Sequence, residues 1–149
     1  MLRAELLGIY PDVTFNDEGL KLEGDQLVDF LSGHDRAIIA LEDINSDILA
    51  GLPKLKVVSK FGVGYDTLDL EALARHGVRV GWKAGVNKRS VSEMVVALSI
   101  CLLRNVFKSN ALVRSGGWKQ FTGAELTGKC VGIIGCGHIG KDVVGLLKP

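Results

Sequence analysis

A glycine-rich turn near the end of the chain carries the residues best suited to chemistry. Gly135, Gly137 and Gly140 have the spacing G-x-G-x-x-G, after the apolar run 131–134 and before an apolar-periodic stretch from 141 to 147. Gly135 permits a tight turn, Gly137 lets a phosphate approach the backbone, and Gly140 lets strand and helix pack closely. This context predicts a dinucleotide-binding turn, with a purely structural glycine turn as the alternative.

The predicted helix after this turn indicates where an anion would bind. Its first N–H groups have no partner within the helix, and the helix dipole adds positive potential there. We therefore assign the pyrophosphate to the turn residues Gly135, Gly137, His138, Ile139 and Gly140. The His138 side chain is expected to face outward beside the phosphates rather than act as a base. The acidic residue that reads the ribose should follow about 20 residues further on, after the last residue of the sequence, so NAD and NADP are not distinguished.

A second candidate is the loop Lys60-Phe-Gly62-Val63-Gly64-Tyr-Asp66, directly after a predicted strand at 57–59. Loops at the carboxyl ends of parallel strands form ligand crevices, and two close glycines allow backbone N–H groups to surround an anion. A plain turn in which Asp66 caps the next helix fits these residues equally well. That helix, expected at 70–76, begins after Asp69 and ends at Gly77.

The composition narrows the class of partner. The 149 residues carry 18 Lys+Arg against 17 Asp+Glu, a net charge of +1, and 47% of them are hydrophobic. This is a soluble globular composition without the basic excess that nucleic acids or anionic membranes require. The apolar run 91–103 is shorter than the about 20 residues of a membrane-spanning helix. The partner is therefore expected to be a small molecule or another protein chain.

The cysteines and the amino terminus predict a cytoplasmic protein. Cys101, Cys130 and Cys136 form no C-x-x-C pair and lie in apolar runs, so reduced, buried thiols are expected. The first residues also lack the apolar stretch of a signal peptide.

Short β-branched runs alternate with helical stretches, which predicts a parallel α/β sheet. Strands are expected at 13–15, 37–41, 57–59, 78–80 and 131–134, and helices at 26–31, 47–52 and 70–76. The strands are continuous apolar runs, as expected when both sheet faces are covered. Residues 1–7 already have a helical pattern, so the chain is expected to start one strand late.

The longest predicted helix, 91–106, is apolar nearly all round, with Ser90 and Glu93 spaced as a capping box. A helix without a polar face is expected to be buried on all sides, here between two domains or two subunits. Residues 108–128 are expected to form an irregular arm.

Four segments in order resemble the D-isomer-specific 2-hydroxy-acid dehydrogenases, the family that includes phosphoglycerate, glycerate and formate dehydrogenases and related transcriptional corepressors. They are Leu55-Lys-Val-Val-Ser-Lys-Phe-Gly-Val-Gly-Tyr-Asp-Thr-Leu-Asp69, Asn87-Lys-Arg-Ser-Val-Ser-Glu93, Gly116-Gly-Trp118 and Leu126-Thr-Gly-Lys-Cys-Val-Gly-Ile-Ile-Gly-Cys-Gly-His-Ile-Gly140. The resemblance implies a flavodoxin-like substrate domain at 1–88. It also implies a domain-crossing helix, a dimerisation arm and the start of a Rossmann domain at 89–149.

The resemblance also implies roles for particular residues. The N–H groups of Val63 and Gly64 would hold the substrate carboxylate, with Lys60 nearby. Val63, Ser90 and Val91 would lie against the nicotinamide side. The implied reaction is hydride transfer between NAD(P) and a small 2-hydroxy or 2-oxo acid, in a homodimer. No metal is implied.

The family's catalytic Arg and its His–Glu acid/base pair lie later in the Rossmann domain and have no counterpart here. His34 and His76 precede the glycine turn and are expected at the surface or at helix ends. The sequence is therefore interpreted as an amino-terminal part of a dehydrogenase that is inactive alone and binds dinucleotide poorly. A non-catalytic dimerisation or binding module of the same fold is the alternative.

Two departures from the family pattern bear on the substrate. Trp82-Lys83-Ala84-Gly85 stands where the family often has Asn-Thr-Pro-Gly, and this adds a ring and a charge near the cleft. Glu42 stands where phosphoglycerate dehydrogenases tend to carry an Arg, which argues against a phosphorylated substrate.

Overall fold

The computed structural model describes residues 2–148, and their contacts divide them into two compact units. The sheet unit runs from the start of the described chain to Lys60 and includes Tyr65–Gly81. The helical unit consists of Phe61–Gly64 and the chain from Trp82 onward. The loop after residue 60 therefore groups with the later part of the chain. The functional division at residue 88 stays a prediction.

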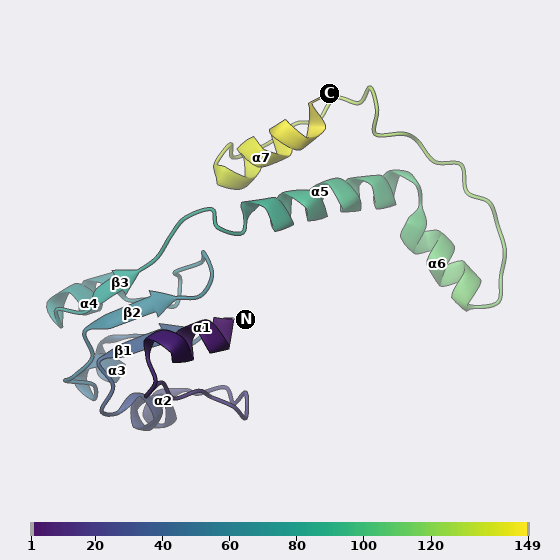
Figure 1. The fold of residues 1–149 in the computed structure, drawn as a ribbon. Coiled ribbons are helices and arrows are strands. Elements are labelled where there is room, and N and C mark those ends of the chain that lie inside the picture. The colour runs from purple at the N-terminus through teal and green to yellow at the C-terminus, as the bar shows by residue number, and fades with distance from the viewer. Residues whose placement is uncertain (1, 149) are drawn as a thin grey trace. The chain divides into compact units, whose positions relative to one another are not determined.

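The sheet unit contains three parallel strands in the order β1-β2-β3, namely β1 (Arg36–Ile39), β2 (Val57–Lys60) and β3 (Arg79–Gly81) (Figure 1). Ala37 lies opposite Val58, and Val58 lies opposite Val80. Parallel neighbours need crossover connections. The helices α3 (Ser46–Ala50) and α4 (Leu70–Arg75) lie in these connections. The predicted α/β class with a parallel sheet is confirmed.

Side-chain caps explain where the two crossover helices begin. Asn45 Oδ1 accepts a hydrogen bond from Ile48 N at 3.0 Å, and Asp69 Oδ1 accepts one from Ala72 N at 2.8 Å. Asp69 is therefore the cap of α4, as predicted, and Asp66 is not. Gly77, with φ +68°, follows the helix in the left-handed conformation that glycine adopts without steric cost.

The core of the sheet unit is made of apolar residues from the strands and from α2 (Gly24–Leu31), α3 and α4. The most deeply buried large side chains in it are Leu27, Ile44, Leu49, Val58 and Leu73. The expectation that both faces of every strand are covered is wrong for the described residues, because Ile38 of β1 is 54% exposed and Val80 of β3 is 37% exposed. Exposed and buried residues alternate along β1, so one face of this strand packs on the core and the other does not.

The amino-terminal segment begins with α1 (Leu2–Ile9), which confirms the expected helical start. The strand predicted at 13–15 does not form. Instead, side chains fix this segment: the Arg3 guanidinium lies 4.1 Å from the Phe15 ring centroid, and Arg3 Nη2 donates to Asp17 Oδ2 at 3.1 Å. A β-branched run becomes a strand only beside another strand, and no strand of residues 2–148 pairs with it.

The helical unit contains α5 (Lys88–Leu103), α6 (Val106–Arg114) and α7 (His138–Leu147), and α7 packs along α5 (Figure 1). The predicted capping box is wrong, because α5 begins three residues earlier than expected. Asn87 is the N-cap residue, and Ser90 Oγ, already inside the first turn, donates to Asn87 O at 2.9 Å.

Within the described chain α5 is covered on one side, so its expected burial between two domains or two subunits stays a prediction. Ser92 is the buried residue of this helix, whereas Met94 is 58%, Leu98 43% and Leu102 69% exposed. These three apolar residues are spaced by four and share one face. The reason is that α7 covers one side of α5 only.

The segment after α5 is more helical than predicted. Asn105, with φ 54°, separates helix α5 from helix α6. Helix α6 occupies the first part of the segment that was expected to be an irregular arm. No single helix among residues 2–148 is long and apolar enough to cross a bilayer, and α5 and α6 meet that criterion only as a pair bent by 65°.

The strand predicted at 131–134 does not form, since residues 2–148 offer it no strand to pair with. Val131 and Ile134 are accordingly exposed. The three thiols are free, as expected, but their predicted burial is wrong: Cys101 is half-buried, while Cys130 and Cys136 are exposed. Both exposed thiols lie close to residues 131–134, which do not pair with another strand.

Candidate functional site: a glycine turn and an open amide loop

The glycine turn has a geometry that each of its glycines makes possible. Gly135 has φ +85°, in the left-handed region that side-chain-bearing residues rarely adopt. A β-carbon on Gly140 would lie 2.6 Å from the carbonyl oxygen of Gly135, so this close approach also requires glycine. A β-carbon on Gly137 would meet no atom of the described chain within 4 Å. The space beside Gly137 is therefore open to a ligand.

The helix start presents free donors to that space. Helix α7 begins at His138 with Gly137 as N-cap, and the first backbone bond that closes a turn runs from Lys141 N to Gly137 O at 3.0 Å. The N–H groups of His138, Ile139 and Gly140 donate to no acceptor among residues 2–148. A pyrophosphate has the charge and the acceptor atoms that such a helix start binds. The turn therefore fits the phosphate portion of a dinucleotide.

Two contacts fix α7 against the first turn of α5. Ser92 Oγ donates to Lys88 O at 2.8 Å and lies 3.4 Å from Ile139 O. Arg89 Nη2 donates to Asp142 Oδ1 at 3.0 Å, and the Asp142 side chain is only 9% exposed. These contacts bring the beginning of α5 beside the glycine turn.

Ser90 and Val91, predicted to lie by the nicotinamide, are in this first turn of α5. Ser90 is exposed and Val91 is half-buried. The structure thus places them in the same unit as the glycine turn, on the helix that packs against α7. Their role toward a cofactor stays a prediction.

Sequence reasoning missed Arg89, Ser92 and Asp142. The opposite charges of Arg89 and Asp142 were the available signal, but the two residues are separated by 53 positions and their pairing becomes visible only once the helices pack. Asp142 Oδ2 and Asn87 Oδ1 are buried and have no hydrogen-bond partner within the described chain.

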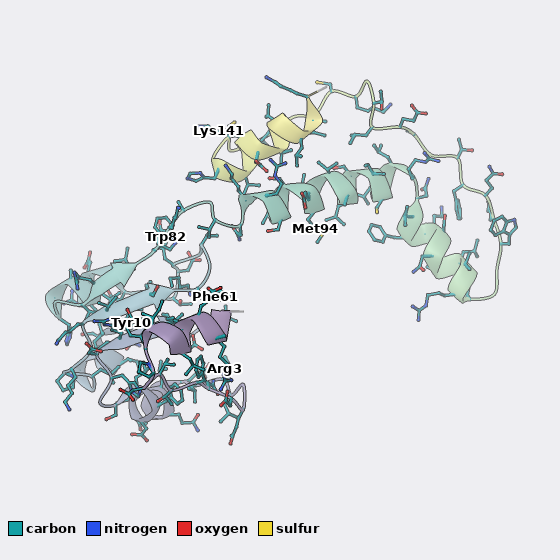
Figure 2. All side chains as sticks on the ribbon, viewed as in Figure 1. Arg3, Tyr10, Phe61, Trp82, Met94 and Lys141 are labelled. Atoms are coloured by element: carbon teal, nitrogen blue, oxygen red, sulfur yellow. The ribbon has the colours of Figure 1, made fainter. Side chains whose placement is uncertain are left out.

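The loop that carries Val63 and Gly64 is also open to an anion. Gly62 has φ +124°, which requires glycine, and the N–H groups of Val63 and Gly64 donate to no acceptor among residues 2–148. Trp82 Nε1 donates to Val63 O at 3.0 Å. Figure 2 labels Trp82 and Phe61, the first residue of this loop. Two adjacent unpaired amides can hold a carboxylate.

Lys60, predicted to lie near the substrate, has structural partners in the sheet unit. Its Nζ donates to Ala40 O and, at 3.0 Å, to Thr67 Oγ1. Glu42 Oε2 accepts from the N–H of Ala40 at 2.7 Å and from that of Leu41 at 3.0 Å. The ammonium and the carboxylate are therefore both tied to the backbone at the carboxyl end of β1.

The histidines expected to be non-catalytic lie in the sheet unit. His34 is half-buried, with Nδ1 3.2 Å from Ser32 O and Nε2 3.2 Å from Thr14 Oγ1. His76 is the exposed C-cap residue of α4. The part of the chain that the structure describes contains no group of three or more His, Cys, Asp or Glu side chains able to hold a metal ion.

Residues 3–142 match the family model described as D-isomer specific 2-hydroxyacid dehydrogenase, catalytic domain. The chain belongs to this family. It is 38% identical over 102 residues to D-3-phosphoglycerate dehydrogenase of Sus scrofa, an alignment that covers 67% of this chain and 19% of the relative. It is 30% identical over 142 residues to glyoxylate reductase of Thermococcus litoralis, covering 89% and 41%.

Among solved structures, a putative D-isomer specific 2-hydroxyacid dehydrogenase, NAD-binding, from Polaromonas sp. JS6 66 superposes with a TM-score of 0.88 at 27% identity. The match covers 98% of this chain and 48% of that protein. The chain thus spans about half or less of the length of each of these relatives. The resemblance and the fold class expected from the sequence are confirmed.

Proposed function

We propose that this chain carries the cofactor turn and the carboxylate loop of an NAD(P)-dependent oxidoreductase acting on a small 2-hydroxy or 2-oxo acid. The observation that carries the proposal is the row of unpaired N–H groups at His138, Ile139 and Gly140 beside the open face of Gly137. The description of the Polaromonas protein as NAD-binding supports NAD as the cofactor, with NADP as the alternative. When bound, the nicotinamide supplies or accepts the hydride.

Different residues of the chain bind the cofactor and the substrate. The glycine turn, from Gly135 to Gly140, holds the pyrophosphate, and Ser90 and Val91 lie against the nicotinamide side. The amides of Val63 and Gly64 bind the substrate carboxylate, and Lys60 adds positive charge near it. Of the three donors of a lysine ammonium, Ala40 O and Thr67 Oγ1 take two, so one N–H stays available.

The substrate preference rests on the residue at position 42. Glu42 stands where phosphoglycerate dehydrogenases tend to carry an Arg, and its carboxylate accepts from two backbone N–H groups at the carboxyl end of β1. We therefore favour a small, unphosphorylated 2-oxo acid. The glyoxylate reductase relative is named for an acid of this kind.

These 149 residues alone are proposed to be inactive. Hydride transfer in this family requires an Arg and a His–Glu pair, and none of the family's motif positions for them is matched here. His34 is engaged with Ser32 and Thr14 in the sheet unit, and His76 ends α4. The oxidoreductase activity is therefore proposed for a gene product that contains these residues together with that catalytic set.

A homodimer is the proposed assembly, with a second copy on the exposed face of α5. Met94, Leu98 and Leu102 form an apolar stripe of a kind that usually marks an interface. This stripe also favours the second candidate function, a non-catalytic dimerisation module of the same fold.

A cytoplasmic location is proposed as well, since the exposed, unpaired Cys130 and Cys136 suit a reducing compartment. Neither a nucleic acid nor a membrane is proposed as a partner.

The test compares two glycine substitutions in α7 and its turn. In the longest gene product that contains these residues, Gly137→Ala should weaken NAD binding about 10-fold or more, because the methyl group occupies the phosphate position. Gly145→Ala is the matched control, since its β-carbon also meets nothing within 4 Å. Isothermal titration with NAD and reduction of glyoxylate are the measurements. Equal NAD affinity in both variants would refute the cofactor assignment, and dimers without turnover would favour the binding-module reading.

A further inference from the structure

We propose that Trp82 is a positioning residue that aims the carboxylate-binding amide of Gly64. This inference rests on the proposed function of the loop. The indole Nε1 donates to Val63 O at 3.0 Å, although the two residues are 19 positions apart in the chain. Trp82 is the first residue after β3 and belongs to the same unit as Phe61–Gly64.

The bond acts on Gly64 through the peptide plane. The carbonyl of Val63 and the N–H of Gly64 belong to one planar peptide unit, and the described chain contains no cis peptide. In a trans peptide these two groups point in opposite directions. By holding the carbonyl oxygen, the indole therefore directs the Gly64 N–H away from Trp82 and keeps it out of reach of the ring. A hydrogen bond to the carbonyl also polarises the peptide and makes its N–H a stronger donor.

The loop has little else to fix that orientation. No other hydrogen bond of the described chain holds residues 62–64. Gly62 has φ +124°, and a glycine leaves the peptide planes on either side of it free to rotate. Phe61 does not anchor the loop by burial, since it is 65% exposed. The indole bond thus favours the orientation in which the 63–64 peptide presents its N–H, rather than its carbonyl oxygen, to an anion.

The apolar core of the sheet unit does not include Trp82. Its side chain is 43% exposed. A substitution at Trp82 should therefore change the loop without unfolding the protein. This separation makes the inference testable.

The kinetic experiment uses Trp82→Phe, which keeps a ring but removes the N–H donor. In the longest gene product containing these residues, the KM for glyoxylate should rise about 5-fold, the effect of one lost hydrogen bond, with NAD affinity unchanged. The control is Tyr10→Phe, which removes an aromatic hydrogen-bonding group in the sheet unit, where Tyr10 Oη accepts from Arg36 Nη1 at 2.8 Å. It should leave both constants unchanged.

A second measurement does not depend on turnover. In ¹⁵N-labelled 149-residue protein, the Trp82 indole N–H should exchange with solvent more slowly than that of Trp118, which is 87% exposed and serves as the internal reference. Added oxalate should shift the Gly64 amide resonance in the wild type, and Trp82→Phe should weaken this response about 5-fold.

The outcomes separate the two claims. The positioning role alone is overturned if the wild type reduces glyoxylate, or its Gly64 amide responds to oxalate, and Trp82→Phe behaves identically. A wild-type protein with neither turnover nor an oxalate response overturns the proposed function and this inference with it. A weakened response in Trp82→Phe with unchanged NAD affinity supports the positioning role.

Discussion

The imidazole of His138 lies directly against the α-carbon of Gly85. A β-carbon at position 85 would come within 2.9 Å of both Cγ and Nδ1 of the ring, and Gly85 itself has φ +69°. The residue that opens α7 therefore touches the turn that precedes α5. This contact adds to those of Ser92 and Arg89 and holds the glycine turn on α5.

Substitution of Gly85 tests this contact. Gly85→Ala should lower the free energy of unfolding by about 1–3 kcal/mol, because it adds both a steric clash and a left-handed alanine. His138→Ala in the same background should recover the part due to the clash and leave the backbone part. Urea denaturation of the single and double variants measures both. Strictly additive effects would mean that the two residues do not interact.

The Arg89–Asp142 pair predicts an asymmetric response. Arg89→Met leaves a carboxylate that is only 9% exposed without its cation and should cost about 2 kcal/mol of stability. Asp142→Asn removes the charge and leaves an amide of similar shape, so it should cost less than about 1 kcal/mol. The figure for Arg89 is below that of a fully buried pair because its side chain is 55% exposed. Chemical denaturation distinguishes the two, and a larger loss from Asp142→Asn would contradict the assignment.

A pH effect is expected at the amino terminus. The hydrogen bond from Arg3 lowers the pKa of Asp17 from its usual value of 3.8. Since the folded-state pKa lies below the unfolded one, the pair contributes in full above 3.8 and its contribution is lost as the pH falls through the lowered value. Amide hydrogen exchange in α1 should therefore be faster in Asp17→Asn than in the wild type at about pH 6, and the difference should shrink as the pH falls through the lowered pKa. A difference that persists in acid would argue against this ion pair.

The exposed stripe on α5 predicts a change of assembly. Ser92 marks the side of α5 that faces α7, and Met94, two residues further on, lies about 200° around the helix. Figure 2 labels Met94 on this helix. Leu98→Glu with Leu102→Glu should convert a dimer to a monomer in sedimentation velocity, because the charges would be buried in the interface. Lys54→Glu, on an exposed residue of the sheet unit, is the control for added negative charge. A wild-type monomer would contradict the proposed dimer.

Features fixed by adjacent residues, such as the ends of helix α4, could be predicted from the sequence. Asp69 and Gly77 mark the limits of α4 correctly, because a cap needs only the adjacent backbone. The run at 131–134 has the residues of a strand, but a strand is completed by a partner that sequence periodicity cannot supply. Ser90 and Glu93 had the spacing of a capping box, yet the three residues before Val91 already continue the helix to Asn87.

In the candidate site, too, local features could be predicted from the sequence, whereas contacts between distant residues could not. The glycines of the turn could be identified one by one, since each reflects a local backbone requirement. The contacts that position the turn, from Gly85, Arg89 and Ser92, come from about 50 residues earlier and depend on how α5 and α7 pack. The indole bond of Trp82 likewise joins a loop to a residue beyond two intervening elements.

The exposed thiol of Cys136 sits between two glycines of the turn and gives the protein a built-in chemical probe. It is free and accessible, and Cys130, equally exposed, lies six residues earlier outside the turn. A maleimide should modify both in the ligand-free protein. A dinucleotide lying over the turn would shield Cys136 and leave Cys130 reactive, so mass spectrometry of the alkylated peptides reports occupancy of the turn without any measurement of turnover.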